Sequence, residues 1–449
     1  MNLREFLLDD GGAGLWVVAV GAMANVSCAL LGCYLVLRRL SLLGDAISHA
    51  VLPGIVVAFL LSGKTAILPM FVGAIVVGLL TAFLTQTLHS FGKVPEDASM
   101  GVVFTSLFAL GVLLIARFAS NIDLDPGCVL YGLLEFVGTD TFPLAGWEVP
   151  RAAQSLTIAL VGTLLFITAL WKELKIVSFD PILATAMGIS AGAVHYMLMG
   201  MVAVVTVASF EAVGSILVIA MLIVPGAAAH LLTDRLAWMM VWAACIAVVS
   251  SLIGYLAAAY WNTSVAGMMA VVAGLQFTLV VFLAPNHGLI GKAVRSLRLS
   301  LRVVSEDIIA LLYRLEELPS EKIGAAGPQG IGQAGGWNAC VQAAGGGPIG
   351  WLAAQRLWRR GEVRWFSPGE LRLTDRGRRR AQSIVRSHRL WEAYLGEHFD
   401  LPLDHLHAPA ERIEHFIGPE LQQRLSEELQ TPGYDPHGRE IPSPPAQDG

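Results

Sequence analysis

Long apolar runs constrain this chain more than any other feature of its sequence. Nine runs, most of about 20 residues, precede residue 285, and a helix of that length spans the hydrocarbon core of a bilayer. Because lipid offers no hydrogen-bond partners, such segments must satisfy their own backbone groups as helices. The sequence therefore predicts an all-α polytopic membrane protein with about nine transmembrane helices. The candidate spans lie at about 15–37, 43–61, 66–88, 100–118, 153–171, 191–208, 212–231, 237–259 and 264–284.

Charged residues are distributed unevenly along the chain. Of the 449 residues, 55% are hydrophobic and only 14% are charged, which is too apolar for an ordinary soluble protein. Residues 1–285 contain 10 Lys or Arg and 15 Asp or Glu, whereas residues 286–449 contain 20 of each class. We therefore expect a membrane domain followed by a soluble tail of about 160 residues.

The loop charges orient the predicted spans. If the spans alternate in direction, ten basic residues fall on one side of the membrane and four on the other. By the positive-inside rule, the richer side is cytoplasmic. The prediction is a multi-pass protein of the cell (inner or plasma) membrane, with its N-terminus outside and its tail in the cytoplasm. The ten residues are Arg38, Arg39, Lys93, Lys172, Lys175, Arg235, Lys292, Arg295, Arg298 and Arg302.

A carboxylate and an imidazole stand at the start of the second apolar run. Asp45 and His49 are four residues apart, so they share one face of a helix, with Ser48 close to it. Ionisable groups are costly in lipid and usually face a bundle interior or a water path. A carboxylate and a neutral imidazole also ligate divalent cations. Two interpretations stay open: a metal-translocation site, or an Asp that caps the helix beside a His bonded to a backbone carbonyl.

The segment 45–54, DAISHAVLPG, resembles the signature segment of the ABC permeases that import manganese, zinc or iron. The resemblance covers about residues 10–290. It implies that Asp45 and His49 line a metal path. It also implies three partners: a separate ABC ATPase chain, an extracytoplasmic metal-binding protein, and a second permease subunit in a homodimer or heterodimer. The chain itself is then a transport subunit and not an enzyme, and it lacks a phosphate-binding loop, because Ala58 stands where the segment around Gly63 would need glycine.

Residues 172–188 form the largest cytoplasmic loop between the predicted spans. Asp180 followed by Pro181 predicts the start of a helix, and Gly188 predicts its end. A short amphipathic helix has no partner within this loop, so it either docks on another protein or lies along the membrane surface. In the permease family, the similar segment is the coupling helix that enters a cleft on the ATPase. The match is carried by Phe179, Asp180, Pro181, Ala184 and Gly188.

The tail combines helical and strand patterns. Apolar residues recur every three to four positions over 297–318, and Pro348 opens a further helix. Two short strands around 367–369 predict a hairpin, and a long helix follows over 374–399. Helix followed by hairpin is the order of a winged helix. Residues 324–347 are rich in Gly, Ala and Gln, and we expect a linker or a degraded element there.

Histidines and glutamates gather on the last predicted helices. His388 and Glu392 are four residues apart on the long helix. Four more groups at i, i+4, i+7 and i+8 predict one face of a single following helix. Together these side chains suit a first-row divalent metal, and the alternative is a set of surface salt bridges. The four groups are His407, Glu411, Glu414 and His415.

Residues 300–440 resemble the diphtheria toxin repressor family of iron- and manganese-dependent regulators, including the closing segment 435–442 (DPHGREIP). The resemblance implies a cytoplasmic, mostly α-helical domain with a winged helix and a metal-binding, dimerising part. Asp307 would close the metal site, and glutamate at position 411 resembles the manganese-type members. One metal position would be held by His388, Glu392 and His407, and the other by Glu411, Glu414 and His415.

These expectations divide the chain into a permease domain (1–290), a connecting helix (291–323), a Gly-rich linker or degenerate segment (324–347) and a winged-helix remnant with a metal-sensing and dimerisation domain (348–449). The main hypothesis is that the chain is the membrane-spanning subunit of an ATP-driven importer for a divalent metal. Manganese is the first candidate for this metal, and iron or zinc is the alternative. Its tail would damp transport when cytoplasmic metal rises.

The alternative hypothesis is a membrane-tethered, metal-dependent transcription regulator. A basic wing in the tail suits contacts to nucleic-acid phosphates, to anionic lipid, or to water alone, so nucleic acid stays an open partner. The basic wing consists of Arg376, Arg378, Arg379 and Arg380.

Overall fold

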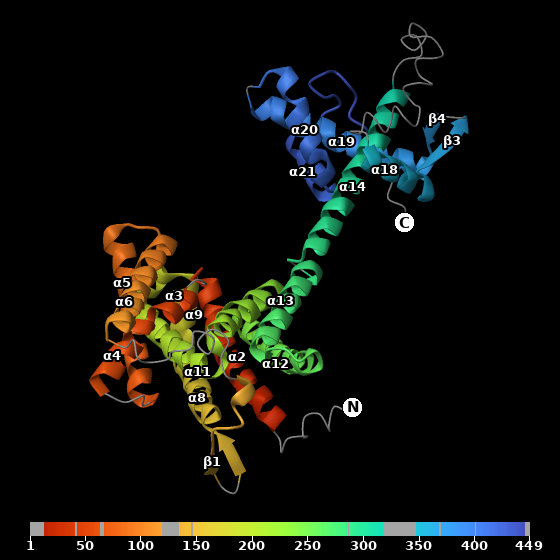
Figure 1. The fold of residues 1–449 in the computed structure, drawn as a ribbon. Helices are drawn as coiled ribbons and strands as arrows, with labels where there is room; N and C mark the ends of the chain where they lie inside the picture. The colour runs from red at the N-terminus through yellow and green to blue at the C-terminus, as the bar shows by residue number, and fades with distance from the viewer. Residues whose placement is uncertain are drawn as a thin grey trace. The chain divides into compact units, whose positions relative to one another are not determined.

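The computed structural model of the protein is mostly helical (Figure 1). By contacts along the chain it divides into two compact units, Met1–Lys292 and Ala293–Gly449. Residues 324–346 of the predicted Gly-rich segment lie outside the described residues. The structure describes residues 13–40, 43–62, 67–118, 134–144, 147–285, 287–317, 347–367, 370–399 and 401–444.

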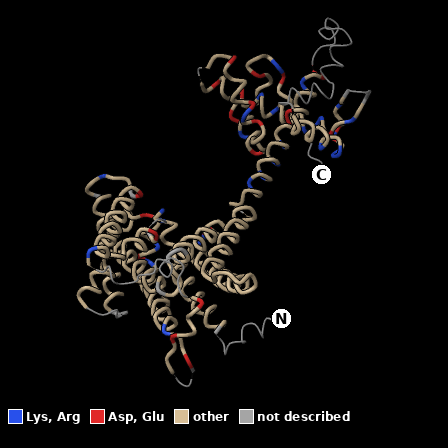
Figure 2. Tube along the Cα trace, viewed as in Figure 1, with Lys and Arg blue, Asp and Glu red and all other residues tan. Residues whose placement is uncertain are grey.

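The first unit is a bundle of apolar helices in which charges are sparse (Figure 2). α11 packs against α2, α5, α8, α12 and α13, so it lies at the centre of the bundle. An antiparallel pair, β1 (Thr141–Leu144) with β2 (Trp147–Pro150), and a 3-10 helix, η1 (Leu134–Phe136), precede α8. The helices are α2 (Ala13–Leu37), α3 (Leu43–Ala50), α4 (Leu52–Ser62), α5 (Ile67–Gly92), α6 (Glu96–Phe118), α8 (Arg151–Ala169), α9 (Trp171–Phe179), α10 (Pro181–Ala186), α11 (Ala191–Leu232), α12 (Leu236–Trp261) and α13 (Val265–Leu283).

Eight helical segments among the described residues are long and apolar enough to cross a membrane. They confirm the prediction of a polytopic membrane protein. The predicted count of nine is approximate, because the seventh predicted span corresponds to a shorter apolar helix, Leu217–Leu232. The eight segments are Gly14–Leu37, Gly44–Ser62, Pro69–His89, Asp97–Phe118, Arg151–Ala169, Ala191–Phe210, Leu236–Trp261 and Val265–Leu283.

The 42-residue α11 reverses direction at Gly214. This residue has φ 75° and ψ 165°, a backbone conformation that is essentially restricted to glycine. Before it, the Ser209 hydroxyl lies 3.7 Å from the Cys28 sulfur of α2; after it, Leu222 lies against Gly32 of α2. In a straight helix Ser209 and Leu222 would be about 20 Å apart, whereas Cys28 and Gly32 are about 6 Å apart along α2. α11 is therefore a helical hairpin whose two limbs correspond to the sixth and seventh predicted spans.

The second unit has the helix, hairpin and helix order predicted for the tail. β3 and β4 pair antiparallel, which confirms the predicted hairpin, and the Thr374 hydroxyl accepts a hydrogen bond from the Gly377 amide and so caps α19. The elements are α14 (Leu289–Glu316, whose first residues belong to the first unit), α18 (Gly347–Arg359), β3 (Val363–Ser367), β4 (Glu370–Leu373), α19 (Asp375–His398), η2 (Leu403–His405), α20 (His407–Ile413), η3 (Glu414–Phe416) and α21 (Pro419–Glu428).

Two small apolar cores hold the second unit together, and α19 contributes to both. In one, Ile308 and Leu312 of α14 are buried with Leu357 of α18. In the other, Leu390 of α19 is buried with Leu425 of α21. α19 therefore fixes the position of the winged helix relative to the last helices of the tail.

The single helix predicted across residues 407–415 is wrong. α20 ends at Ile413, and residues Glu414 to Phe416 form the 3-10 turn η3 before Gly418 and Pro419 start α21. A 3-10 turn has three residues per turn instead of 3.6, so the side chains after Ile413 leave the face that α20 defines. The contacts of these groups differ accordingly: Glu411 contacts His407, whereas His415 contacts Glu306 and Asp307 of α14.

Candidate metal sites

Asp45 and His49 lie on α3, directly after the end of α2. His49 Nε2 is 3.3 Å from Asp45 Oδ1, and their side chains are 39% and 36% exposed in the single chain. The rings of Phe104 and Phe108 on α6 each have centroids 6.1 Å from that of His49. The pair thus sits beside an aromatic wall and offers one oxygen and one nitrogen donor. Among the described residues of the membrane unit, no third His, Cys, Asp or Glu joins them.

The helix that carries this pair is broken immediately after it. α3 ends at Ala50 and α4 begins at Leu52, and the second residue of α4 is Pro53. Proline has no N–H, so Pro53 cannot donate the usual i to i−4 hydrogen bond to the His49 carbonyl. The His49 carbonyl oxygen therefore lacks the usual helical hydrogen bond from residue 53. Broken helices whose freed carbonyls bind cations are a recurring feature of transporters.

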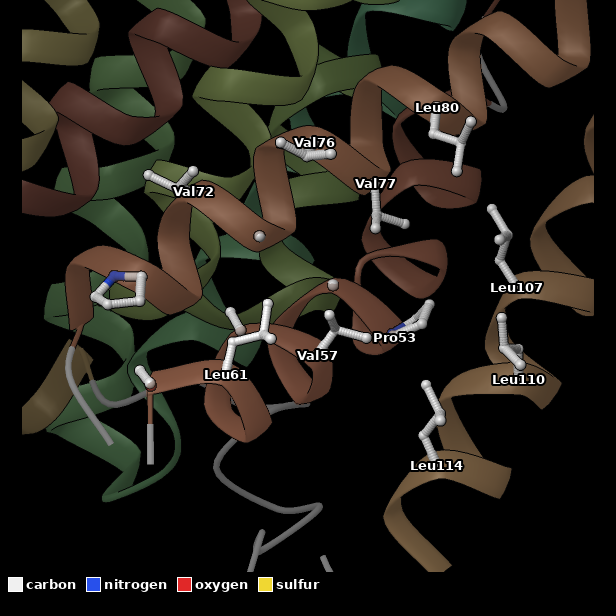
Figure 3. Close-up of a pocket in the computed structure, with 15 residues that line it drawn as sticks. Pro53, Val57, Leu61, Val72, Val76, Val77, Leu80, Leu107, Leu110 and Leu114 are labelled. Carbon is white, nitrogen blue, oxygen red and sulfur yellow. The ribbon is translucent and has the colours of Figure 1, made fainter. Parts of the chain in front are cut away.

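An apolar groove of about 680 Å³ runs between α4, α5 and α6 (Figure 3). Side chains of Val57, Leu61, Val76, Leu110 and Leu114 line it, and its lining residues include no carboxylate and no imidazole. Such a surface suits acyl chains or apolar side chains.

The predicted coupling segment has the local structure that its sequence indicates. Asp180 Oδ1 accepts hydrogen bonds from the amides of Ile182 (3.0 Å) and Leu183 (2.9 Å), which confirms it as the cap of α10, and Pro181 is the first residue of that helix. Gly188 has φ 84°, as expected for a residue that ends a helix.

This segment presents an apolar surface while Ala184 is buried beneath it. The large exposed side chains are those of Phe179, Ile182, Leu183 and Met187, with Ile182 83% exposed. Grouped exposure of large apolar side chains marks an interaction surface or a membrane contact.

The first group in the tail joins α19 to the start of α20. His388 Nε2 lies 3.2 Å from Glu392 Oε1 and 2.9 Å from His407 Nδ1, and His407 Nδ1 lies 3.0 Å from the same Glu392 oxygen. His388 and Glu392 are buried, and His407 is half-buried. Two imidazole nitrogens and one carboxylate oxygen converge within 4.8 Å of one another, which fits a divalent metal. Glu411 approaches this group through His407 Nε2 at 3.2 Å.

The second group joins α14 to η3. His415 Nε2 lies 3.1 Å from Asp307 Oδ1, and Asp307, Glu414 and His415 offer donors within 4.8 Å of one another. They face a cleft of about 490 Å³ that Glu411 and Arg314 also line. Glu411 thus lies along the cleft, but its carboxylate contacts His407 and is not among the converging donors of the second group. Asp307, which the family resemblance implies as a closing ligand, is among those donors.

Three residues that the sequence did not single out support these groups. Glu306 Oε2 lies 3.0 Å from His415 Nδ1, so the two ring nitrogens of His415 face two adjacent carboxylates of α14. Arg314 lies 3.5 Å from Glu414 Oε2, the oxygen that also contacts His388 Nδ1. His437 Nε2 lies 3.7 Å from Glu392. Glu414 thereby connects the two groups.

Neighbouring carboxylates raise the pKa of two of these imidazoles, His388 and His415. Burial lowers the pKa of His415, but hydrogen bonds with Asp307 and Glu306 outweigh it and raise that pKa to about 9. For Glu392, burial disfavours the charged carboxylate and would raise its pKa. Hydrogen bonds with His388 and His407 outweigh this effect and lower the pKa to about 2. The pKa of His388 is raised, because Glu392 and Glu414 outweigh its burial. In the absence of metal, protons take the place of a cation between these donors.

Metal binding to the tail is expected to release protons and to strengthen as pH rises. Because the pKa of His415 is raised to about 9, the ring is protonated below that pH, and a metal must displace the proton. Affinity should rise by up to about tenfold per pH unit between neutral pH and pH 9 and then level off. Calorimetric titration of the full chain with Mn²⁺, in buffers of different ionisation enthalpy, counts the protons. Binding that is independent of both pH and buffer would contradict this ligand set.

Similarity to known proteins agrees with this arrangement. Residues 14–284 match the family model of the ABC 3 transport family, and residues 374–443 match that of the iron dependent repressor, metal binding and dimerisation domain. The chain is therefore a permease-class membrane protein that belongs to the ABC 3 transport family, with a repressor-type metal-binding domain at its C-terminal end.

Individual relatives lie within the same family. The chain is 47% identical over 285 residues to the manganese transport system membrane protein MntD of Bacillus subtilis, covering 63% of this chain and 96% of that protein. It is 41% identical over 300 residues to the zinc transport system membrane protein TroD of Treponema pallidum, covering 66% and 82%. The structure of PsaBC from Streptococcus pneumoniae in complex with Fab matches 64% of this chain and 98% of that chain, with a TM-score of 0.53 and 29% identity.

Proposed function

We propose that this chain is the membrane-spanning subunit of an ATP-driven importer for a divalent metal, with manganese as the main cargo, and that its tail senses the same metal in the cytoplasm. The observation that carries the proposal is the presence of two convergent divalent-metal donor groups in the tail of a chain that belongs to a transport family. Relatives named for manganese and for zinc support the cargo class.

Manganese is favoured over zinc by the chemistry of the donors. Both tail groups offer only imidazole nitrogen and carboxylate oxygen, without thiolate, and the second group has two carboxylates to one imidazole. Zinc sites often use cysteine thiolate, whereas carboxylate-rich sites suit Mn²⁺. The same donors also accept Fe²⁺, so iron is the next candidate.

Asp45 and His49 are proposed to line the translocation path. They supply two side-chain donors, and the carbonyl of His49 supplies a third beside them. A cation moving through a membrane needs donors that bind it without trapping it, and few ligands per chain meet that need. Their partial exposure in the single chain fits a path completed by a second permease subunit, either the same chain or a sister chain.

Within this proposal the chain keeps the domains expected from the sequence. Residues 1–290 form the permease, 291–323 the connecting helix, 324–347 the linker, and 348–449 the winged-helix remnant with the sensing and dimerising part. A purely DNA-regulating role is less well supported, because an anchor needs one span, whereas eight helices among the described residues are long and apolar enough to cross a membrane.

The exposed apolar residues of α10 are proposed to dock on a separate ATPase subunit. Replacing Ile182 with Asp should abolish transport-coupled ATP hydrolysis by the assembled transporter, because a charge would be buried in an apolar contact. Ile182→Leu, which keeps an apolar side chain at the same position, is the control. ATPase activity of the co-purified complex measures the effect, and equal loss in both variants would contradict specific docking through Ile182.

Uptake of radioactive manganese tests the proposal as a whole. The chain would be expressed with candidate ATPase and metal-binding subunits, in cells that lack their own manganese importers. ATP-dependent accumulation of manganese is expected, with zinc and iron as competitors. Accumulation no greater than in cells without the chain would reject the transport role.

A further inference from the structure

The helix α18 exposes large apolar side chains on one face. Trp351, Leu352 and Trp358 are 49%, 40% and 51% exposed. At 100° per residue they fall within an arc of about 120°, on the side of α18 opposite its core contacts. Residues facing the core are Ala353, Ala354 and Leu357. Two indole rings and a leucine on one exposed face are unusual for a soluble domain.

The same winged helix is strongly basic. Between residues 347 and 380 there are nine arginines and three acidic residues. Arg359 and Arg360 are exposed at the end of α18. Arg364 and Arg372 are exposed and are direct cross-strand partners in the β3–β4 hairpin. Two cationic side chains next to each other on an exposed hairpin suit contact with an anionic surface.

We propose that the exposed face of α18 and the β3–β4 hairpin dock on the anionic surface of the lipid bilayer. Tryptophan is enriched at membrane interfaces, where the ring is buried at the level of the headgroups. Arginines beside it attract anionic lipid, with an effect of about fivefold in affinity for each side chain near the surface.

A bilayer explains this surface better than nucleic acid does. Winged helices that read DNA place polar side chains against base edges, whereas the exposed face of α18 carries Trp351, Leu352 and Trp358. The chain also keeps this domain tethered to the bilayer, because α14 begins at Leu289, only six residues after the apolar helix α13 ends at Leu283. The docking proposal does not depend on which metal the chain transports, since none of these residues belongs to a metal group.

Hydrogen exchange of the full chain in nanodiscs tests the docking. One preparation uses phosphatidylcholine alone, and the other uses equal parts phosphatidylcholine and phosphatidylglycerol. Exchange of peptides covering α18 and β3–β4 should slow by at least about fivefold in the anionic discs. Arg364→Gln with Arg372→Gln, and separately Trp351→Gln with Trp358→Gln, should each remove most of this difference while α19 exchanges as in the wild type.

Matched controls make the outcome decisive. Arg424→Gln with Arg439→Gln removes the same charge from exposed positions elsewhere in the tail and should leave the lipid effect intact. Equal exchange in the two lipids, or equal loss in the control, would overturn the proposal. Stronger protection of α18 by added duplex DNA in neutral discs than by anionic lipid would assign the surface to nucleic acid instead.

Discussion

Replacing Asp45 or His49 with alanine is expected to stop manganese uptake. The two side chains are the only carboxylate and imidazole that face each other within an apolar span among the described residues of the membrane unit, with 3.3 Å between His49 Nε2 and Asp45 Oδ1. Loss of even an outer partner of a metal ligand costs about 10- to 100-fold in affinity, so loss of either donor should reduce uptake by about 100-fold or more. Initial rates of radioactive manganese uptake measure the effect.

A second Asp–His pair in the same unit provides the control. Asp234 Oδ1 lies 3.0 Å from His287 Nε2, at the ends of apolar helices, and the two side chains are 70% and 41% exposed. Alanine at both positions removes the same two chemical groups and should leave uptake within about twofold of wild type, as surface ion pairs contribute little. Unchanged uptake in the Asp45 and His49 variants, with normal protein in the membrane, would remove them from the metal path.

Replacing Glu414 and His415 together with alanine is expected to uncouple transport from cytoplasmic metal. The pair supplies two of the three donors of the second group, and Glu414 also contacts His388 of the first group. The variant should lose at least one bound Mn²⁺ per chain by calorimetry. Cells carrying it should accumulate several-fold more manganese than wild type in rich medium, because a ligand shifts an equilibrium only by its differential affinity for the two states.

The exposed neighbours Asp404 and His405 offer the matched control. Their side chains are 81% and 67% exposed, with 4.0 Å between the ionic atoms, and neither belongs to a donor group. Alanine at both should change neither metal stoichiometry nor accumulation. If the Glu414 and His415 variant behaves like this control, the tail is not a sensor.

The membrane bundle could be predicted from hydropathy because lipid leaves a chain few structural choices. The cap at Asp180 and the hairpin around 367–369 could be predicted for a similar reason, since local side-chain chemistry determines both. The reversal of chain direction within α11 was harder to predict from the sequence. Gly214 is one of several small residues in an apolar run, and only its backbone conformation and the contacts of Ser209 and Leu222 with α2 show that it carries a turn.

The tail groups could be predicted only in part, because long-range contacts decide them. His388 and Glu392 meet as their spacing suggests, and His407 joins them as the family resemblance implies. Glu414 and His415 leave the face of α20, since the helix ends at Ile413 and contacts to His388 and α14 hold the turn that follows. The role of Glu306 depends on the distant His415, and no sequence spacing reports that contact.

The most direct test of the account is the initial rate of ATP-driven manganese uptake by the reconstituted transporter as manganese is raised on the cytoplasmic side. Proteoliposomes with defined internal metal give this rate for the wild-type chain with its ATPase and binding protein. The account predicts rapid uptake at low cytoplasmic manganese and a saturable decline as the tail groups fill. A rate that is independent of cytoplasmic manganese, or uptake that never exceeds that of protein-free vesicles, would contradict it.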